Sequence, residues 1–140
     1  MPKRREILER LCSSFGIAIL YAFGSQAENV RNWVEERIDG LSATSDVDIG
    51  VRGISGKKWS AIEKVRLSIA LEDLLSSSKV DLVMLSEADP FLAAEIIRGE
   101  RLFALDEYEA DEFELYILRR AGDLALLERE RMNLVLGESR

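Results

Sequence analysis

Three short apolar segments, each the length of one β-strand, alternate along this chain with longer stretches of helical periodicity. The first, residues 17–23, is a continuous apolar run between Gly16 and Gly24, which is typical of a buried strand. Residues 46–51 and 80–85 are the other two, and each combines branched apolar residues with aspartate. Strands that alternate with helices predict an α+β fold in which helices pack on a mixed central sheet.

Five helical patterns surround these strands, and several carry recognisable end signals. We expect helices at residues 3–14, 24–40, 60–76, 89–99 and 106–136, the last of them long, with a possible short edge strand at 102–105. Ser60 and Glu63 have the spacing of a capping box, and Asp89 precedes a proline, which favours the first turn of a helix. The inward faces are predicted to carry Ala27, Val30, Val34 and Ile38 in the second helix and Ile62, Val65, Ile69 and Leu74 in the third.

The length of 140 residues predicts a single domain, 1–140, with one core of its own. The chain has no histidine, which excludes Ser-His and Cys-His nucleophile pairs and every metal site that needs imidazole. Its one cysteine, Cys12, excludes an internal disulfide and favours a reducing, cytoplasmic setting. Acid-base or metal chemistry must therefore use carboxylates.

The excess of acidic residues limits the kinds of partner that the protein can bind. Lysine and arginine number 19 against 26 aspartates and glutamates, a net charge of −7, which opposes binding to nucleic acid or to an anionic membrane surface. The apolar stretch 11–23 follows three basic residues, as the apolar part of a secretory signal does. Charged residues between the two, however, interrupt the pattern of a signal, and the apolar residues here recur at the spacing of an amphipathic helix. No run approaches the roughly 20 apolar residues needed to span a bilayer, so we expect neither export nor insertion.

Asp46 and Asp48 are the most informative pair of candidate site residues. Alternate residues of a strand point to the same face, so both carboxylates are expected side by side while Val47 and Ile49 point into the core. Neighbouring carboxylates repel each other, and a divalent cation such as Mg²⁺ relieves that repulsion with oxygen ligands. An ordinary amphipathic strand with two solvated acids has the same pattern, so the pair alone does not decide between these interpretations.

Asp81 lies in the third strand among branched apolar residues, where a carboxylate must find a partner or shift its pKa. In a chain without histidine, a carboxylate next to a bound cation is the available candidate for a general base. A strand-end acid exposed to solvent is the alternative interpretation. Asp81 is therefore a candidate catalytic residue that depends on the position of Asp46 and Asp48.

Gly24-Ser25 lies between a predicted strand and a predicted helix. At such a junction free backbone N–H groups and the helix dipole attract anions, glycine allows a phosphate to approach the backbone, and a serine hydroxyl donates a further hydrogen bond. A serine that only caps the helix would have the same sequence. The dipeptide is a candidate phosphate site when it is considered together with the carboxylates.

These segments in this order resemble the polymerase-β-type nucleotidyltransferase superfamily, in particular its minimal nucleotidyltransferases. The resemblance rests on Phe23-Gly24-Ser25, Ser45-Asp46-Val47-Asp48-Ile49-Gly50-Val51 and Val80-Asp81-Leu82-Val83. It implies the nucleotidyltransferase fold, nucleotide phosphates held by Gly24 and Ser25, and two Mg²⁺ ions bound by Asp46 and Asp48 with Asp81 completing the site.

The resemblance also implies an activity and a partner. Members of this group transfer AMP from ATP to a hydroxyl, and the minimal members often act as antitoxins that modify a tyrosine of an α-helical HEPN-type toxin. The expected function is therefore Mg²⁺-dependent nucleotidyl transfer, with a protein acceptor and a toxin–antitoxin role. The net charge of −7 and the lack of a basic RNA-binding surface disfavour nucleic acid as the acceptor.

Two alternatives remain open on the sequence alone. One is a small-molecule nucleotidyltransferase of the kind that modifies antibiotics. The other is a module with the same fold that neutralises a partner by contact, through the acidic residues 106–114 and the helix beyond. Apolar residues available for that contact are Phe113, Tyr116, Ile117, Leu124 and Leu127, unless they pack on the protein's own sheet.

Overall fold

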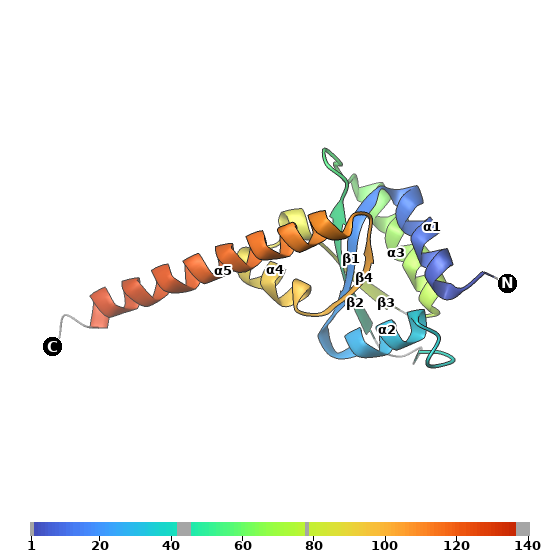
Figure 1. Ribbon diagram of the computed structural model, residues 1–140, viewed down its shortest axis with the longest axis horizontal. Helices are drawn as coiled ribbons and strands as arrows, with labels where there is room; N and C mark the ends of the chain where they lie inside the picture. Colours follow the sequence, from blue (N-terminus) through green and yellow to red (C-terminus); the bar gives the residue numbers. More distant parts are fainter. Residues whose placement is uncertain (1, 42–45, 78, 137–140) are drawn as a thin grey trace.

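A computed structural model describes residues 2–41, 46–77 and 79–136, and it contains a four-stranded mixed sheet (Figure 1). The strands are β1 (Ile17–Phe23), β2 (Asp46–Gly53), β3 (Lys79–Met84) and β4 (Glu100–Ala104), in the order β3-β2-β1-β4. β1 is antiparallel to both of its neighbours, whereas β2 and β3 are parallel. The predicted mixed sheet is confirmed, and the possible fourth strand forms its edge, beginning two residues earlier than expected.

Five α-helices cover this sheet (Figure 1). They are α1 (Arg4–Phe15), α2 (Ala27–Val34), α3 (Ala61–Leu75), α4 (Pro90–Ile97) and α5 (Glu107–Leu136), with short 3₁₀ turns at Gly24–Gln26 and Leu85–Glu87. In the part of the chain that the structure describes, none of these helices has the length and apolar character that crossing a membrane requires. The predicted α+β class is confirmed, including the long C-terminal helix.

The two faces of the sheet are covered by different helices. On one face, α1, α2 and α3 enclose a core with Leu20 and Val30 at its centre, together with Ile49 and Leu71. On the other face, α4 and the first half of α5 cover a second core that includes Tyr21 and Ile96. Side chains of one strand alternate between these two cores, as the pleat of a strand requires.

The predicted helix-start signals are confirmed. Ser60 and Glu63 form a reciprocal capping box at the start of α3, and the Asp89 carboxylate accepts a hydrogen bond of 2.9 Å from the Leu92 N–H at the start of α4. At α5, the Asp106 carboxylate accepts a hydrogen bond of 3.0 Å from the Glu109 N–H. Each cap satisfies a backbone donor that the first turn of a helix leaves unpaired.

The predicted end of the second helix, near Gly40, is wrong. α2 ends at Val34, and Glu36 adopts a left-handed conformation with φ 60°. The Arg4 guanidinium of α1 donates hydrogen bonds to the carbonyls of Trp33 and Ile38, at 2.9 and 2.6 Å. This long-range cap satisfies carbonyls that a continuing helix would have bonded internally. The rest of the predicted polar link to β2, residues 42–45, lies outside the described residues, and Ser45 of the motif with it.

The predicted inward face of α3 is also wrong. Ile62, Val65 and Ile69 are 64%, 57% and 51% exposed, and of the four predicted positions only Leu74 packs partly against the core. The residues that α3 buries are instead Leu67, Leu71 and Leu75. The helix carries two apolar stripes, and only one of them can face the sheet. Helical spacing alone does not distinguish the two stripes.

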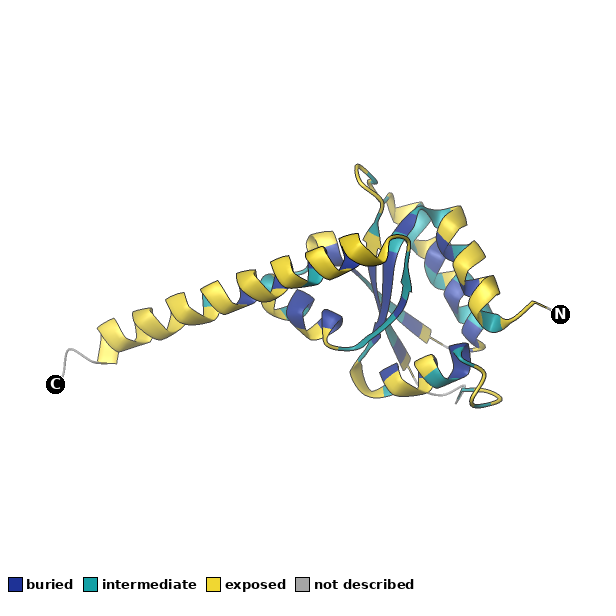
Figure 2. Cartoon of the chain, in the orientation of Figure 1, coloured by how far each residue is buried: buried dark blue, intermediate teal, exposed yellow. Residues whose placement is uncertain are grey.

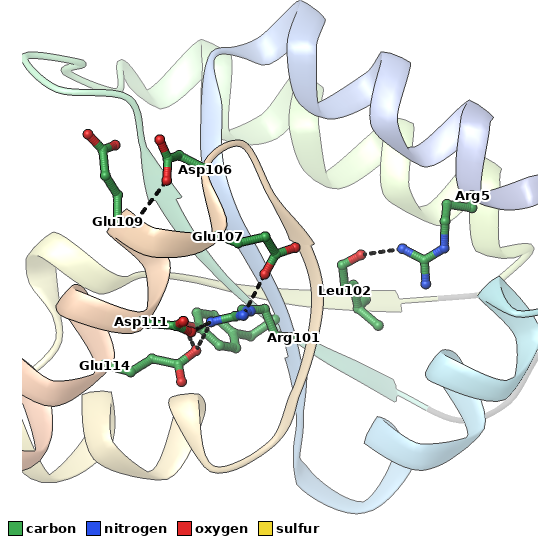
Figure 3. A network of polar contacts seen from close by, with 9 residues as sticks. Arg5, Arg101, Leu102, Asp106, Glu107, Glu109, Asp111 and Glu114 are labelled. Atoms are coloured by element: carbon green, nitrogen blue, oxygen red, sulfur yellow. Dashed lines mark hydrogen bonds and ion pairs between the residues drawn. The ribbon is translucent and has the colours of Figure 1, made fainter.

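An arginine network ties the first half of α5 to β4 (Figure 3). The Arg101 guanidinium contacts the carboxylates of Glu107, Asp111 and Glu114 at 2.6, 3.0 and 3.0 Å. The Tyr21 hydroxyl donates a further 2.7 Å hydrogen bond to Glu114. Several acids of the segment 106–114, which the sequence offers as a contact surface, are therefore used within the protein.

Candidate nucleotidyl-transfer site

The ends of three strands meet at one edge of the sheet. Because β1 is antiparallel to β2, and β2 is parallel to β3, the C-terminal end of β1 lies beside the N-terminal ends of β2 and β3. Phe23 pairs with Asp48, and Asp48 pairs in turn with Asp81. The topology therefore brings the Gly24 turn and the carboxylates of two strands to the same place.

The three predicted carboxylates lie on the face of the sheet that α4 and α5 only partly cover. Asp48 and Asp81 are partly exposed and are directly opposite each other on neighbouring strands, which lie about 4.8 Å apart. Burial raises the pKa of the Asp48 carboxyl, and the nearby Asp81 and Asp46 carboxylates raise this pKa further. Asp48 thus lies between two other acids, with Asp81 opposite it on the next strand and Asp46 two residues before it on the same face of β2.

The backbone of Gly24 lies against Asp48 of this cluster. It has a φ of +75°, and a Cβ atom at this position would lie 2.5 Å from Asp48 Oδ2. Only glycine leaves room for the carboxylate against the backbone here, and it also adopts the left-handed conformation at little cost. Gly24 and Asp48 are therefore fitted to each other, which the sequence does not reveal.

Ser25 lies in the exposed 3₁₀ turn that follows Gly24, ahead of α2. Neither this turn nor α2 begins with a side-chain capping hydrogen bond. Among the hydrogen bonds of the described residues, the Ser25 hydroxyl therefore has no capping role, which was the alternative explanation for a serine at this position. Ser25 is exposed and directly follows Gly24, which lies against Asp48.

Two charged residues near the cluster are missing from the prediction. Lys79 forms an ion pair with Asp81, with 3.4 Å between Nζ and Oδ1. Its position two residues before Asp81 puts both on one face of β3, so strand periodicity alone would have found it. Glu95 of α4 adds to the negative charge around Asp48. Only the packing of α4 on the sheet brings Glu95 close, and no sequence signal points to that contact.

The donor set of this cluster fits a hard divalent cation. It consists of carboxylate oxygens, the ligands that Mg²⁺ prefers, and their mutual repulsion is relieved by positive charge between them. Within residues 2–41, 46–77 and 79–136, however, no group of three or more aspartate, glutamate or cysteine side chains is placed so that it could already hold a metal ion, and this includes the three site aspartates.

The two obvious nucleophiles of the chain lie in its cores. Burial raises the pKa of the Cys12 thiol to about 12, and the Glu9 carboxylate contributes to the same shift. Burial also raises the pKa of the Tyr21 hydroxyl, which is hydrogen-bonded to Glu114. Both groups stay protonated near neutral pH and are shielded from substrates, so the chemistry of the site is the chemistry of its carboxylates.

Comparison with solved structures shows the same fold in proteins of toxin–antitoxin systems. One match is to a chain of a toxin–antitoxin complex with AMP-PNP, with a TM-score of 0.68, 19% sequence identity and coverage of 94% of this chain and 98% of that one. Another is to a chain of the Shewanella oneidensis complex of tri-AMPylated HEPN toxin with MNT antitoxin, with a TM-score of 0.64, 18% identity and coverage of 95% and 96%.

A third match is to a protein described as a minimal nucleotidyltransferase. Its TM-score is 0.51 and its identity 29%, with coverage of 69% of this chain and 86% of that one. No curated protein sequence matches the chain significantly. Residues 5–108 match the family model described as polymerase beta, nucleotidyltransferase, and this range includes Gly24 and all three site aspartates. The chain therefore belongs to the polymerase beta nucleotidyltransferase family.

Proposed function

We propose that this protein is a Mg²⁺-dependent nucleotidyltransferase that transfers AMP from ATP to a hydroxyl group of a partner protein. The observation that supports it most is the fit of Gly24 against Asp48, beside Asp81, at the edge where three strands end. A phosphate chain that approaches the Gly24 turn would lie directly next to the carboxylates. Family membership supports the same reaction class.

The proposed roles follow from position. The backbone at Gly24 and the hydroxyl of Ser25 bind phosphate oxygens of the nucleotide. Asp46, Asp48 and Asp81 hold two Mg²⁺ ions, which when bound supply positive charge to the attacking and leaving oxygens. The acceptor hydroxyl forms a bond to the α-phosphorus, the bond to pyrophosphate breaks, and Asp81 accepts the hydroxyl proton.

Lys79 and Ser25 have supporting roles in this proposal. The ammonium of Lys79 forms an ion pair with Asp81, with 3.4 Å between Nζ and Oδ1, and so helps to hold this carboxylate in place. Ser25 is free of any capping hydrogen bond in the described residues and can turn its hydroxyl toward a phosphate. Both side chains orient or hold groups and take no part in bond formation.

A protein acceptor, specifically a tyrosine of a HEPN-type toxin, is the second part of the proposal. A net charge of −7 opposes a phosphate-backbone acceptor. The similar solved structures include one with AMP-PNP and one with a tri-AMPylated HEPN toxin bound to its antitoxin. A reducing, cytoplasmic setting belongs to the same proposal, because the single cysteine is a buried free thiol.

An intact-mass experiment tests both parts. The protein is incubated with ATP, Mg²⁺ and a HEPN-type toxin, and in a second tube with total RNA and labelled ATP. We expect the toxin to gain the mass of AMP with the native chain and with Asp73→Asn, an exposed acid of α3, but not with Asp46→Asn. Label that enters RNA and no protein would contradict the protein acceptor.

Neutralisation by contact alone is a second candidate, and one observation favours it. The half of α5 beyond Ala121 lies exposed and carries apolar side chains, which is unusual for a surface with no partner. Under this function the protein binds its partner without Mg²⁺ and never modifies it. Binding that persists in EDTA, together with an unmodified partner after incubation with ATP and Mg²⁺, would identify the contact mechanism.

A further inference from the structure

The second half of α5 leaves the body of the protein (Figures 1 and 2). Its first half buries four side chains, Ala110, Phe113, Ile117 and Ala121, whereas none of the described residues from 122 to 136 is buried. A helix of about 12–15 residues is marginal in water without tertiary packing. This extension continues a helix that the first half anchors, but it has no packing of its own on the protein, and a packing partner would stabilise it.

A seam of regularly spaced residues runs along the whole of this helix half. We define the α5 seam as Ile117, Arg120, Leu124, Leu127, Arg131 and Leu134. Their spacing alternates between three and four residues, which places all six on one helix face in the pattern of a coiled coil. Ile117 packs in the second core, and further along Leu127 and Leu134 are 58% and 64% exposed. The seam thus continues the protein's own packing face into solvent.

A groove of about 360 Å³ lies at the base of the seam. Its lining includes the apolar residues Ala88 and Pro90 together with Arg52, Tyr116 and Arg120. The Arg52 guanidinium lies over the Phe113 ring at 4.0 Å, and Arg120 lies over Tyr116 at 5.8 Å. Among the ion pairs of the described residues, neither arginine has a carboxylate partner. The base of the seam therefore combines apolar side chains with unpaired positive charge in a protein of net charge −7.

The charges of the seam disfavour a second copy of this chain as its occupant. In a parallel pair of copies, each seam arginine lies opposite itself. In an antiparallel pair in which Leu124 lies opposite Leu127, Arg120 lies opposite Arg131. Like charges within a helix seam oppose pairing, and they are a common device for excluding self-association.

We propose that the α5 seam is the docking site for an α-helix of a different protein, one that carries carboxylates opposite Arg120 and Arg131. Arg131 now contacts Glu128 at 3.2 Å, but both side chains are largely exposed, so this pair is easily exchanged. From Ile117 to Leu134 the seam is about 26 Å long, the length of a helix of about five turns. Such a helix would bury the apolar seam residues and pair both arginines.

This inference goes beyond the proposed transfer reaction. Arg52 lies at the opposite end of β2 from Asp46, so the groove and the seam are remote from the carboxylates. The docking surface therefore holds its partner whether or not that partner accepts AMP. Binding and transfer are separate measurements, so a failure of one can be told apart from a failure of the other.

Two labelled synthetic helices of three heptads provide the test. Both carry leucine at the seam positions, and they differ only at the two positions opposite Arg120 and Arg131, which are glutamate in one and lysine in the other. By fluorescence anisotropy with the full chain, we expect the glutamate helix to bind at least about tenfold more tightly. The double variant Arg120→Glu, Arg131→Glu should invert this preference.

Matched variants locate the contact on the helix. Leu127→Asp should abolish binding, whereas Leu126→Asp, on the opposite side of α5 and 52% exposed, should retain it. Both positions are exposed, so both variants should keep the helical content of the native chain by circular dichroism. Equal binding of the two synthetic helices, no binding of either, or a dimer of the native chain that Leu127→Asp dissociates would each overturn the proposal.

Discussion

The two faces of strand β2 carry side chains of different kinds. Val47, Ile49 and Val51 are almost completely buried against α1, α2 and α3. The residues between them face the other side, where Asp46 and Asp48 are partly or fully exposed. The side chains on one face of β2 therefore stabilise the core, and those on the other face include the candidate catalytic aspartates. Substitutions on the two faces should have separable effects on stability and on transfer.

The largest expected effect is on transfer. Asp48→Asn should lower the rate of AMP transfer at least about a thousandfold, equivalent to about 4 kcal/mol, because it removes a carboxylate ligand of the proposed metal site. Stability should not fall. The pKa of Asp48 is raised in the folded protein, so its charge disfavours folding near neutral pH and its removal relieves that cost. Urea unfolding and a transfer assay on the same preparation measure both effects.

Truncation of a side chain in the core that covers the apolar face of β2 should lower stability and leave transfer unchanged. Leu71→Ala removes a side chain that is 1% exposed in the first core, and should lower the free energy of unfolding by about 2–5 kcal/mol. The molecules that stay folded should transfer AMP at the native rate. The control is Ile69→Ala, two residues away and 51% exposed, for which we expect a change of less than about 0.5 kcal/mol. Similar losses for the two variants would contradict the burial of α3 described above.

Gly24 has a left-handed backbone conformation and lies against Asp48, so its replacement should lower both the stability of the protein and the rate of transfer. Gly24→Ala puts a Cβ 2.5 Å from Asp48 Oδ2 at a φ of +75°. We expect a loss of about 1–2 kcal/mol of stability and about tenfold in transfer, because Asp48 must move. Gly56→Ala is the matched control, since Gly56 has a φ of +81° with open space around the position of a Cβ. A Gly56 variant with the same loss of transfer would show that backbone strain alone is responsible.

The smallest expected effect is an absence of reactivity on the buried face. Burial raises the pKa of Cys12 to about 12, so less than a thousandth of the thiol is ionised near pH 8. A disulfide reagent should leave Cys12 unmodified in the native protein and label it completely in denaturant. Rapid labelling of the native protein at the rate of a free thiol would show that the core around α1 opens readily.

The strands and helix starts were predictable because each has a local cause. The run from Ile17 to Phe23 is apolar on both faces, as a central strand must be, and the caps at Ser60 and Asp89 are local hydrogen bonds. The end of α2 was not predictable, because Arg4 caps it from another helix. The position of Glu95 near Asp48 was not predictable either, because only tertiary packing brings the two together.

The candidate site was predictable to a similar extent. Strand periodicity places Asp46 and Asp48 on one face, and the sheet topology then brings Asp81 opposite Asp48. The close fit between Gly24 and Asp48 depends on the register of β1 against β2, which the sequence does not specify. The spacing of Ile62, Val65 and Ile69 likewise identifies an apolar face of α3 but does not show that this face points away from the sheet.

The most direct test of the account is the binding of Mn²⁺, as a spectroscopic substitute for Mg²⁺, in the presence of a non-hydrolysable ATP analogue. Electron paramagnetic resonance measures the free Mn²⁺ in titrations of the native chain, Asp48→Asn and Asp73→Asn. We expect that the native chain and Asp73→Asn bind Mn²⁺ and nucleotide together, and that Asp48→Asn loses this binding while remaining folded. Equal Mn²⁺ binding by all three proteins would contradict the assignment of a metal and nucleotide site to Asp46, Asp48 and Asp81.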